Sequence, residues 1–179
     1  MEDEAHRWVF GYGSLMWRPG FPFVSSGPGT VHGYHRAFCV YSHHYRGTEA
    51  EPGLVLGLDR GGSCHGTAFE VEREVWPETL AYLRERELVT KVYREMHLKV
   101  RSGGRVVKAL AYVVDRGHPQ YAGALSPAEQ ARFIAMGNGV SGRNTDYALA
   151  TLAHLREAGI HDPRLEALSR LIQPDGGRP

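Results

Sequence analysis

Strand-like and helix-like segments are segregated along this chain, and this segregation limits its possible folds more than any other feature. Short runs rich in Val, Tyr, Phe and Leu fill most of the first two thirds of the 179 residues, whereas most helical signals lie in the last third. Such segregation is typical of α+β domains. We expect a twisted sheet that can close into a barrel. We also expect a single domain over residues 1–179, with an ordered core at about residues 8–172 and a tail at 173–179.

The strand signals are apolar runs bounded by turn residues. They occur at residues 8–10, 30–41, 54–58, 66–71, 92–101 and 106–114. The sequence Asp59-Arg60-Gly61-Gly62 predicts a turn between two of these strands, and Ser102-Gly103-Gly104 predicts a hairpin.

Helix signals begin at residues 77–88, where Pro77 suits the first helical position. The remaining helices are expected near the end of the chain. They are one that starts at a capping box over residues 126–129 and stops at 137–139, one capped by Asn144 or Thr145 and closed by Gly159, and one from 162–163 to 172.

The charge balance excludes several functional classes. Lys and Arg number 21 against 20 Asp and Glu, which leaves a net charge of +1 and no basic excess of the kind that nucleic-acid binders show. No apolar run approaches the roughly 20 residues of a membrane span. The acidic N-terminus lacks the apolar run of a secretory signal, so we expect a cytoplasmic protein with reduced thiols. Nothing in the sequence indicates the oligomeric state.

Ten histidines raise the question of a metal site. His32 and His35 lie an odd number of residues apart in a predicted strand, so their side chains point to opposite faces. The adjacent His43 and His44 also point apart, and neither cysteine spacing nor a His-Glu-x-x-His pattern indicates zinc. We expect hydrogen-bonding surface or edge histidines, no metal, and two buried thiols at Cys39 and Cys64 rather than a nucleophile.

A glycine-rich loop follows the first strand and comprises Gly11, Tyr12, Gly13, Ser14, Leu15 and Met16. Successive N–H groups in such a turn can bind a carboxylate, a phosphate or a developing oxyanion. The loop lacks the third glycine of a dinucleotide fingerprint, the Gly-Lys-Ser/Thr of a P-loop and the flanking glycines of a nucleophile elbow. A tight turn without a ligand is the alternative. For the side chain of Tyr12, stacking or hydrogen bonding near the loop and simple packing all stay open.

Glu87 lies on the inward face of the helix predicted at residues 77–88. At about 100° per residue, Glu87 falls about 20° from Leu80, whereas Glu85 falls about 140° away and Arg86 about 120° away on the other flank. Burial raises the pKa of a carboxyl group and makes it a usable base near neutral pH. Two alternatives stay open: an ion pair with an arginine in the core, or a helix that frays before Glu87.

Taken together, these motifs resemble the ChaC-type γ-glutamylcyclotransferases, which act on glutathione. The resemblance extends from Trp8 almost to Ile172. It is carried by residues 8–19, His32-Gly33-Tyr34-His35-Arg36, Arg46-Gly47-Thr48, residues 52–58, an Arg-Glu pair within residues 82–87, and Gly142-Arg143-Asn144-Thr145-Asp146-Tyr147. The sequence departs from the family pattern at one place: Lys91-Val92 precedes Tyr93, where some members have two glycines. The shape of this loop is therefore not implied by the resemblance.

The resemblance implies a small mixed β-barrel flanked by helices and the cleavage of glutathione to 5-oxoproline and cysteinylglycine. It implies that Glu87 is the catalytic acid/base, that residues 11–16 bind the γ-glutamyl group, and that Tyr147 contacts substrate. No cofactor has a task in this reaction.

Rival functions are a cyclotransferase for other γ-glutamyl amino acids or amines, a non-catalytic anion-binding module and, more remotely, a metal-dependent hydrolase. Arg18, Arg36 and Arg46 are candidates for binding the glycyl carboxylate, against ordinary structural or solvated roles.

Overall fold

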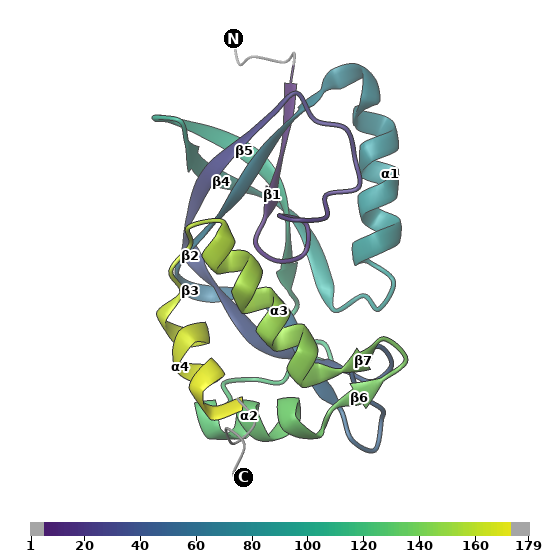
Figure 1. Ribbon diagram of the computed structural model, residues 1–179. Coiled ribbons are helices and arrows are strands. Elements are labelled where there is room, and N and C mark those ends of the chain that lie inside the picture. The colour runs from purple at the N-terminus through teal and green to yellow at the C-terminus, as the bar shows by residue number, and fades with distance from the viewer. Residues whose placement is uncertain (1–5, 173–179) are drawn as a thin grey trace. The chain divides into compact units, whose positions relative to one another are not determined.

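The computed structural model describes residues 6–172, so the predicted tail at 173–179 lies outside the described residues. The structure contains the following elements, all of which except the short η1 are labelled in Figure 1. They are β1 (His6–Gly11), β2 (Ser25–Ser42), β3 (Gly53–Glu72), the 3-10 helix η1 (Arg73–Val75), α1 (Trp76–Glu87), β4 (Tyr93–Ser102), β5 (Arg105–Val114), α2 (Pro127–Met136), β6 (Asn138–Gly139), β7 (Gly142–Arg143), α3 (Asn144–Glu157) and α4 (Pro163–Ile172). Within residues 6–172, the structure contains no helix with the length and apolar character that crossing a membrane requires.

The chain divides into two compact units. The first comprises Met1–Arg36 and Leu58–His118, and the second comprises Ala37–Gly57 and Pro119–Pro179. The single domain that we expect from the sequence therefore stays a prediction, and the two units are described separately below.

A closed barrel with the strand order β1-β3-β2-β4-β5 forms the centre of the fold. β1 pairs antiparallel with β3 and parallel with β5, and β4 pairs antiparallel with β5. The sheet is therefore mixed, and together with the α-helices of residues 6–172 it confirms the predicted α+β barrel.

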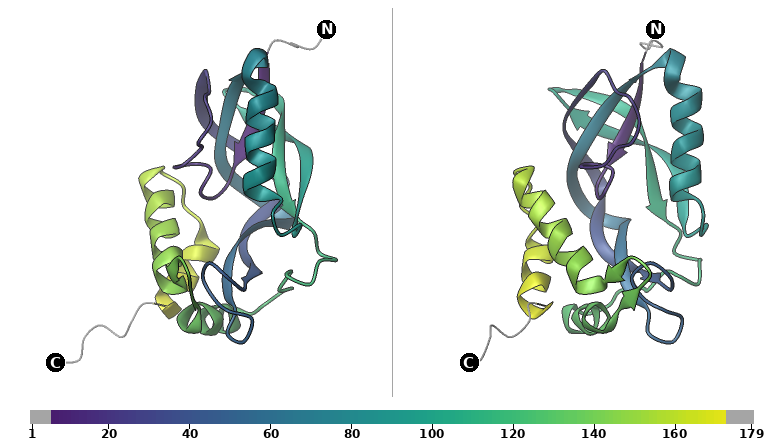
Figure 2. Two further views of the ribbon diagram at one scale, coloured as in Figure 1. Left: turned by 90° about the vertical axis from the view of Figure 1, so that its right-hand side faces the viewer. Right: turned by 45° about the vertical axis from the view of Figure 1, so that its right-hand side comes forward.

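Apolar side chains from three barrel strands form a core that α1 covers. Val9 of β1 pairs with Phe69 of β3 and with Leu110 of β5, which brings these buried side chains together. Leu83 of α1 is completely buried in this cluster, and Leu80 packs against it. Figure 2 shows α1 lying along the barrel in both views. This packing sets the rotation of α1, and so determines which residues of its last turn face inward.

β3 corrects one prediction, because residues 54–58 and 66–71 belong to one continuous strand of 20 residues. The predicted turn at 59–62 therefore lies inside the strand. Gly61 and Gly62 adopt φ values of 100° and 68°, a left-handed conformation that glycine accepts without steric cost. The carboxylate of Asp59 accepts a 2.8 Å hydrogen bond from the N–H of Arg60 and a 2.7 Å hydrogen bond from Nε of Arg116.

The second unit contains α2, α3, α4 and the short β6–β7 hairpin, which the sequence did not predict. The capping box of α2 is confirmed, with Ser126 and Glu129 bonding each other's backbone. The predicted cap of α3 is wrong. Its N-cap is Arg143, and the amide of Asn144 instead pairs with both backbone groups of Leu54 at 2.8 Å, so that it acts as a partner for the start of β3.

Gly66 of β3 permits the close approach of β1, since a Cβ at Gly66 would collide with the carbonyl oxygen of Gly11 and with the Phe10 ring. Both neighbours are buried, so a clash there cannot be relieved cheaply. We expect Gly66→Ala to destabilise the protein by about 1–3 kcal/mol, as overpacking does. The matched control is Gly27→Ala, because a Cβ at Gly27 would have no atom within 4 Å. Equal urea midpoints for the two variants would contradict this packing.

Candidate active site

The loop after β1 forms a compact turn. The N–H of Met16 donates to the carbonyl of Gly13 at 2.9 Å, and the N–H of Arg18 donates to the carbonyl of Ser14 at 2.8 Å. The Tyr12 and Leu15 side chains are buried, which anchors the turn to the first unit. The carbonyl groups of Gly13 and Ser14 thus accept hydrogen bonds from other residues of the same turn.

Three successive N–H groups of this loop lack protein partners. Among residues 6–172, no protein atom accepts a hydrogen bond from the N–H of Gly13, Ser14 or Leu15. Gly13 itself is buried. Buried backbone donors are almost always paired, with protein, water or ligand. The arrangement therefore favours an anion-binding loop over a turn without a ligand.

Arg86, which sequence reasoning left on the flank of the helix, ties α1 to this loop. Its Nη2 donates to Oγ of Ser14 at 2.9 Å, and its Nη1 donates to the carbonyl of Arg18 at 2.6 Å. The same Nη1 lies 3.3 Å from the carbonyl of Pro19 and 3.0 Å from the hydroxyl of Tyr82. Arg86 therefore joins the glycine loop to the last turn of α1. The only sequence signal for it was the Arg-Glu pair within the family resemblance.

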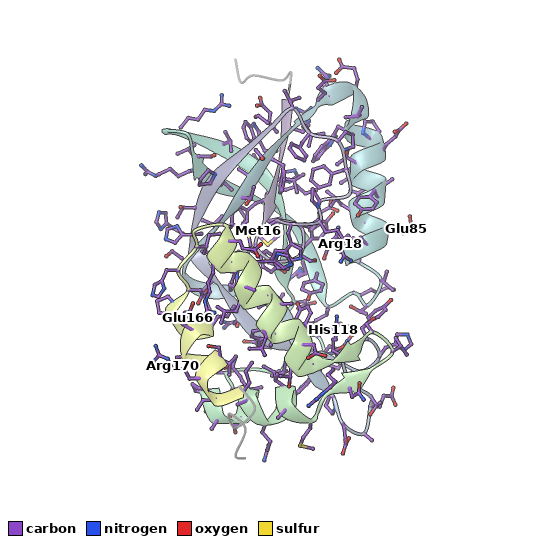
Figure 3. All side chains as sticks on the ribbon, in the orientation of Figure 1. Met16, Arg18, Glu85, His118, Glu166 and Arg170 are labelled. Carbon is purple, nitrogen blue, oxygen red and sulfur yellow. The ribbon has the colours of Figure 1, made fainter. Side chains whose placement is uncertain are left out.

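Glu87 faces inward, as the helix periodicity predicts. Its side chain is 18% exposed, and Oε1 lies 3.4 Å from Nε of Arg86. Burial raises the pKa of the Glu87 carboxyl, and the positive charge of Arg86 opposes this shift only in part. Glu85, two residues earlier, is exposed and points away from the barrel (Figure 3). Glu87 therefore both contacts an arginine and is largely withdrawn from water, and its role as a base stays a prediction. The helix does not fray before Glu87.

A second glutamate in the first unit has the opposite electrostatic environment. Glu95 of β4 accepts two hydrogen bonds from Arg84, at 2.9 and 2.8 Å, and one from the hydroxyl of Tyr112 at 3.3 Å. The hydrogen bonds from Arg84 above all lower the pKa of Glu95. Burial, together with the negative charges of Glu95 and Glu87, raises the pKa of Tyr112. Tyr112 thus stays protonated, and Glu95 stays ionised.

Tyr147 lies on α3 in the second unit, whereas the glycine loop, Arg86 and Glu87 belong to the first. Its hydroxyl accepts a 3.4 Å hydrogen bond from the N–H of Leu56, and Arg46 stacks 5.3 Å above its ring. Tyr147 therefore has structural contacts within its own unit, and a contact with substrate stays a prediction.

The predicted arginine candidates divide into structural and unassigned side chains. Arg46 also donates to the carbonyl of Arg143, and buried Arg36 donates to two backbone carbonyls. The side chain of Arg18 is exposed and has no partner within residues 6–172 (Figure 3). Arg18 therefore stays the candidate for a substrate carboxylate.

Two histidines form hydrogen bonds, whereas the buried Nδ1 of His43 has no hydrogen-bond partner within residues 6–172. His35 bonds the carbonyl of Gly61, His65 bonds the hydroxyl of Thr30, and both Cys39 and Cys64 are buried free thiols, as expected. In the described part of the chain, no three His, Cys, Asp or Glu side chains gather in an arrangement that would hold a metal ion.

Comparison with known proteins places this arrangement in a family. The family model described as ChaC-like protein matches residues 7–174. The chain belongs to the ChaC-like family. It is 36% identical over 167 residues to the glutathione-specific gamma-glutamylcyclotransferase of Escherichia coli, covering 93% of this chain and 72% of the relative. It is 37% identical over 173 residues to the human glutathione-specific gamma-glutamylcyclotransferase 1, covering 93% of this chain and 78% of that one.

A solved structure shares the ChaC-like fold. The crystal structure of a gamma-glutamyl cyclotransferase specific to glutathione from yeast matches with a TM-score of 0.82, covering 94% of this chain and 96% of that one. The two sequences are 23% identical, so this likeness shows the fold alone.

The raised pKa of Glu87 predicts a pH-dependent effect of Glu87→Gln on stability. A carboxyl group whose pKa is higher in the folded state than in the unfolded state binds more protons when folded, so its contribution to stability falls as pH rises above about 4.5. Glutamine does not ionise, so its contribution to stability does not fall as the pH rises. We expect the variant to gain stability relative to wild type as pH rises from 4.5 toward neutrality. Urea unfolding at several pH values measures the difference. A difference that is constant with pH would contradict the shift.

Lys91 occupies a backbone conformation that glycine prefers, with φ at 58°. Lys91 is one of the two residues, Lys91 and Val92, at which the family resemblance left the local loop shape in question. A non-glycine residue there is strained by about 1–2 kcal/mol, and glycine's greater unfolded-state entropy offsets part of the relief. We expect Lys91→Gly to stabilise the protein by up to about 1 kcal/mol. Lys91→Ala keeps the Cβ and should show no such gain in thermal unfolding. Equal stability of the two variants would contradict the strain.

Proposed function

We propose that this protein is a γ-glutamylcyclotransferase that cleaves glutathione to 5-oxoproline and cysteinylglycine. One observation carries the proposal. A largely buried carboxyl group with a raised pKa, Glu87, contacts the guanidinium of Arg86, which also binds the glycine loop; in that loop the N–H groups of Gly13, Ser14 and Leu15 have no protein acceptor within residues 6–172. The names of the relatives from Escherichia coli and human, which are glutathione-specific, support this substrate.

In this reaction the substrate supplies its own nucleophile. The α-ammonium of the γ-glutamyl residue gives a proton to Glu87, and the resulting amine attacks the γ-carbonyl carbon. A C–N bond forms, the five-membered ring closes, and the γ-carbonyl oxygen becomes an oxyanion. Holding the amine and the carbonyl within reach of each other supplies much of the rate, because the attack is intramolecular.

Collapse of the tetrahedral intermediate breaks the original amide bond. Glu87 returns its proton to the departing cysteinyl nitrogen. Over the whole reaction the attacking nitrogen loses two protons and the leaving nitrogen gains two, so neither water nor an oxidant is consumed. The N–H groups of Gly13, Ser14 and Leu15 would stabilise the oxyanion or hold a substrate carboxylate. The proton transfers need one carboxyl group, so this chemistry calls for no metal or cofactor.

Glu87 suits this role better than Glu95. A base must be free to accept a proton near neutral pH, and burial raises the pKa of Glu87 toward that range. The hydrogen bonds from Arg84 hold the pKa of Glu95 low, and its oxygens already accept hydrogen bonds. Exposed Arg18 is our candidate for the glycyl carboxylate of glutathione, and Tyr147 for a second substrate contact.

A cytoplasmic location is part of the same proposal. Glutathione helps to keep cytosolic thiols reduced, so the proposed substrate is present there. The small, anionic substrate also suits a chain whose net charge is +1, because a local site rather than a broad basic surface would recognise it.

The test is an assay for 5-oxoproline after incubation with glutathione. Glu87→Gln preserves the shape of the side chain and removes the base, so we expect activity to fall by at least about 100-fold in a folded protein. Glu85→Gln, on the exposed face of the same helix, is the matched control and should retain wild-type activity. Full activity in Glu87→Gln would overturn the assignment of the base.

The same assay separates the rival functions. Faster turnover of γ-glutamyl-alanine than of glutathione would indicate a cyclotransferase for other γ-glutamyl compounds. Binding without any 5-oxoproline formation would indicate an anion-binding module.

A further inference from the structure

Arg36 is a buried charged residue that contacts the backbone of the glycine loop. It lies on β2 and is 2% exposed. Its Nε donates to the carbonyl of Tyr12 at 2.6 Å, and its Nη2 donates to the carbonyl of His65 on β3 at 2.6 Å. Removing a guanidinium from water costs several kcal/mol unless its donors find good acceptors. Its two short hydrogen bonds therefore show that backbone carbonyls hold this charge in a defined place.

The hydrogen bond to Tyr12 determines the orientation of the peptide group that precedes Gly13. The carbonyl of Tyr12 and the N–H of Gly13 belong to the same planar trans peptide and point in opposite directions. Because Arg36 holds the carbonyl, the N–H must point away from Arg36. This N–H belongs to the loop's three donors without a protein acceptor in the described part of the chain, and Gly13 is buried.

A positively charged donor on the carbonyl also strengthens the N–H at the other side of the peptide. Hydrogen bonds in a chain polarise one another, and charge-assisted bonds are roughly twice as strong as neutral ones. The Gly13 N–H is thereby both oriented and made a better donor toward an anion.

We propose that Arg36 is a positioning residue, which orients and polarises the Tyr12–Gly13 peptide so that the Gly13 N–H binds the anionic group of the γ-glutamyl substrate. The proposal rests on the proposed function, since it assigns the loop to this substrate. Arg36 itself does not touch the substrate. Its role is distinct from that of Arg86, which holds the loop by Ser14 and the carbonyls after it.

Two variants test the proposal in the full chain. Arg36→Lys keeps the charge, but one ammonium group cannot reproduce the fixed fork that holds both carbonyls. Arg36→Met removes the donors at similar volume. We expect kcat/KM for glutathione, per folded molecule, to fall about 100-fold in Arg36→Met and by a smaller factor in Arg36→Lys. Circular dichroism gives the folded fraction.

A control arginine that does not contact the glycine loop is available in the same unit, although its side chain is 47% exposed. Arg116 donates through Nε to Asp59 at 2.7 Å and through Nη2 to the carbonyl of Arg60 at 3.3 Å, so it makes a similar pair of contacts elsewhere. Arg116→Lys should therefore leave kcat/KM unchanged. If Arg36→Lys and Arg36→Met, both folded, also keep the wild-type kcat/KM, the proposal is overturned and Arg36 is structural.

A second readout reports on the Gly13 amide directly. We expect its NMR resonance to shift when 5-oxoproline is added to the wild-type protein, and to shift less in the Arg36 variants. The wild-type Arg36 Nε–H resonance should shift in the same titration, because the two donors share one peptide group. This last measurement decides the question even if neither variant folds, since a Gly13 shift without an Arg36 shift would overturn the coupling.

Failure of the proposal and failure of the proposed function give different results. Wild-type protein that forms no 5-oxoproline contradicts the function. Active wild-type protein with fully active, folded Arg36 variants contradicts the positioning role alone.

Discussion

The candidate active site depends on one guanidinium group. Arg86 directs its donors at the side chain of Ser14 and at the carbonyls of Arg18 and Pro19, so the loop after β1 and the last turn of α1 are held together. A guanidinium presents its donors in a fixed, planar fork, which the single ammonium of lysine cannot match. The next residue along the helix is Glu87. The contact that shapes the loop therefore also places the carboxyl group beside it.

Arg86 has a second, opposing effect on this carboxyl group. Its charge lies 3.4 Å from Glu87 and favours the ionised form, whereas burial favours the protonated form. Burial has the larger effect, so the pKa of Glu87 is raised. A carboxyl group that must bind a proton and release it again needs a pKa that is raised by burial but held in check by a nearby positive charge. A fully paired carboxylate, such as Glu95 with Arg84, would bind protons too weakly for that role.

The two glutamates show how one small fold separates proton-binding groups. Glu95 lies on a strand, where Arg84 from α1 and Tyr112 from the neighbouring strand donate to it. Glu87 lies on the inward face of α1, with burial as the main influence. Pairs of titratable groups whose environments move their pKa values apart are a recurring property of acid–base sites. Here the packing of Leu83 and its neighbours sets the rotation of α1 on the barrel. This rotation turns Glu87 inward.

The sequence predicted the features of the site that follow from helix periodicity. It missed the contacts that long side chains make and the contacts between residues far apart in the sequence. Helix arithmetic placed Glu87 inward and Glu85 outward, because it describes where a side chain leaves the helix. It placed Arg86 on the flank for the same reason, yet a long side chain can bend toward acceptors that the arithmetic does not contain. The continuity of β3 through residues 59–62 was missed because two successive glycines are typical of a turn, whereas here Gly61 and Gly62 lie within the strand. Asn144 was read as a cap because its partner, Leu54, lies 90 residues away in sequence.

Composition carried little information about the site because the proposed anion-binding groups belong to the backbone. The N–H groups of Gly13, Ser14 and Leu15 have the same chemistry as any other peptide N–H. What distinguishes them is the conformation of the loop. That conformation depends on a close approach between Gly66 and Gly11 and on the carbonyl contacts made by Arg36 and Arg86. A nearly neutral chain can therefore build a local site for an anion from peptide dipoles and two arginines placed behind them.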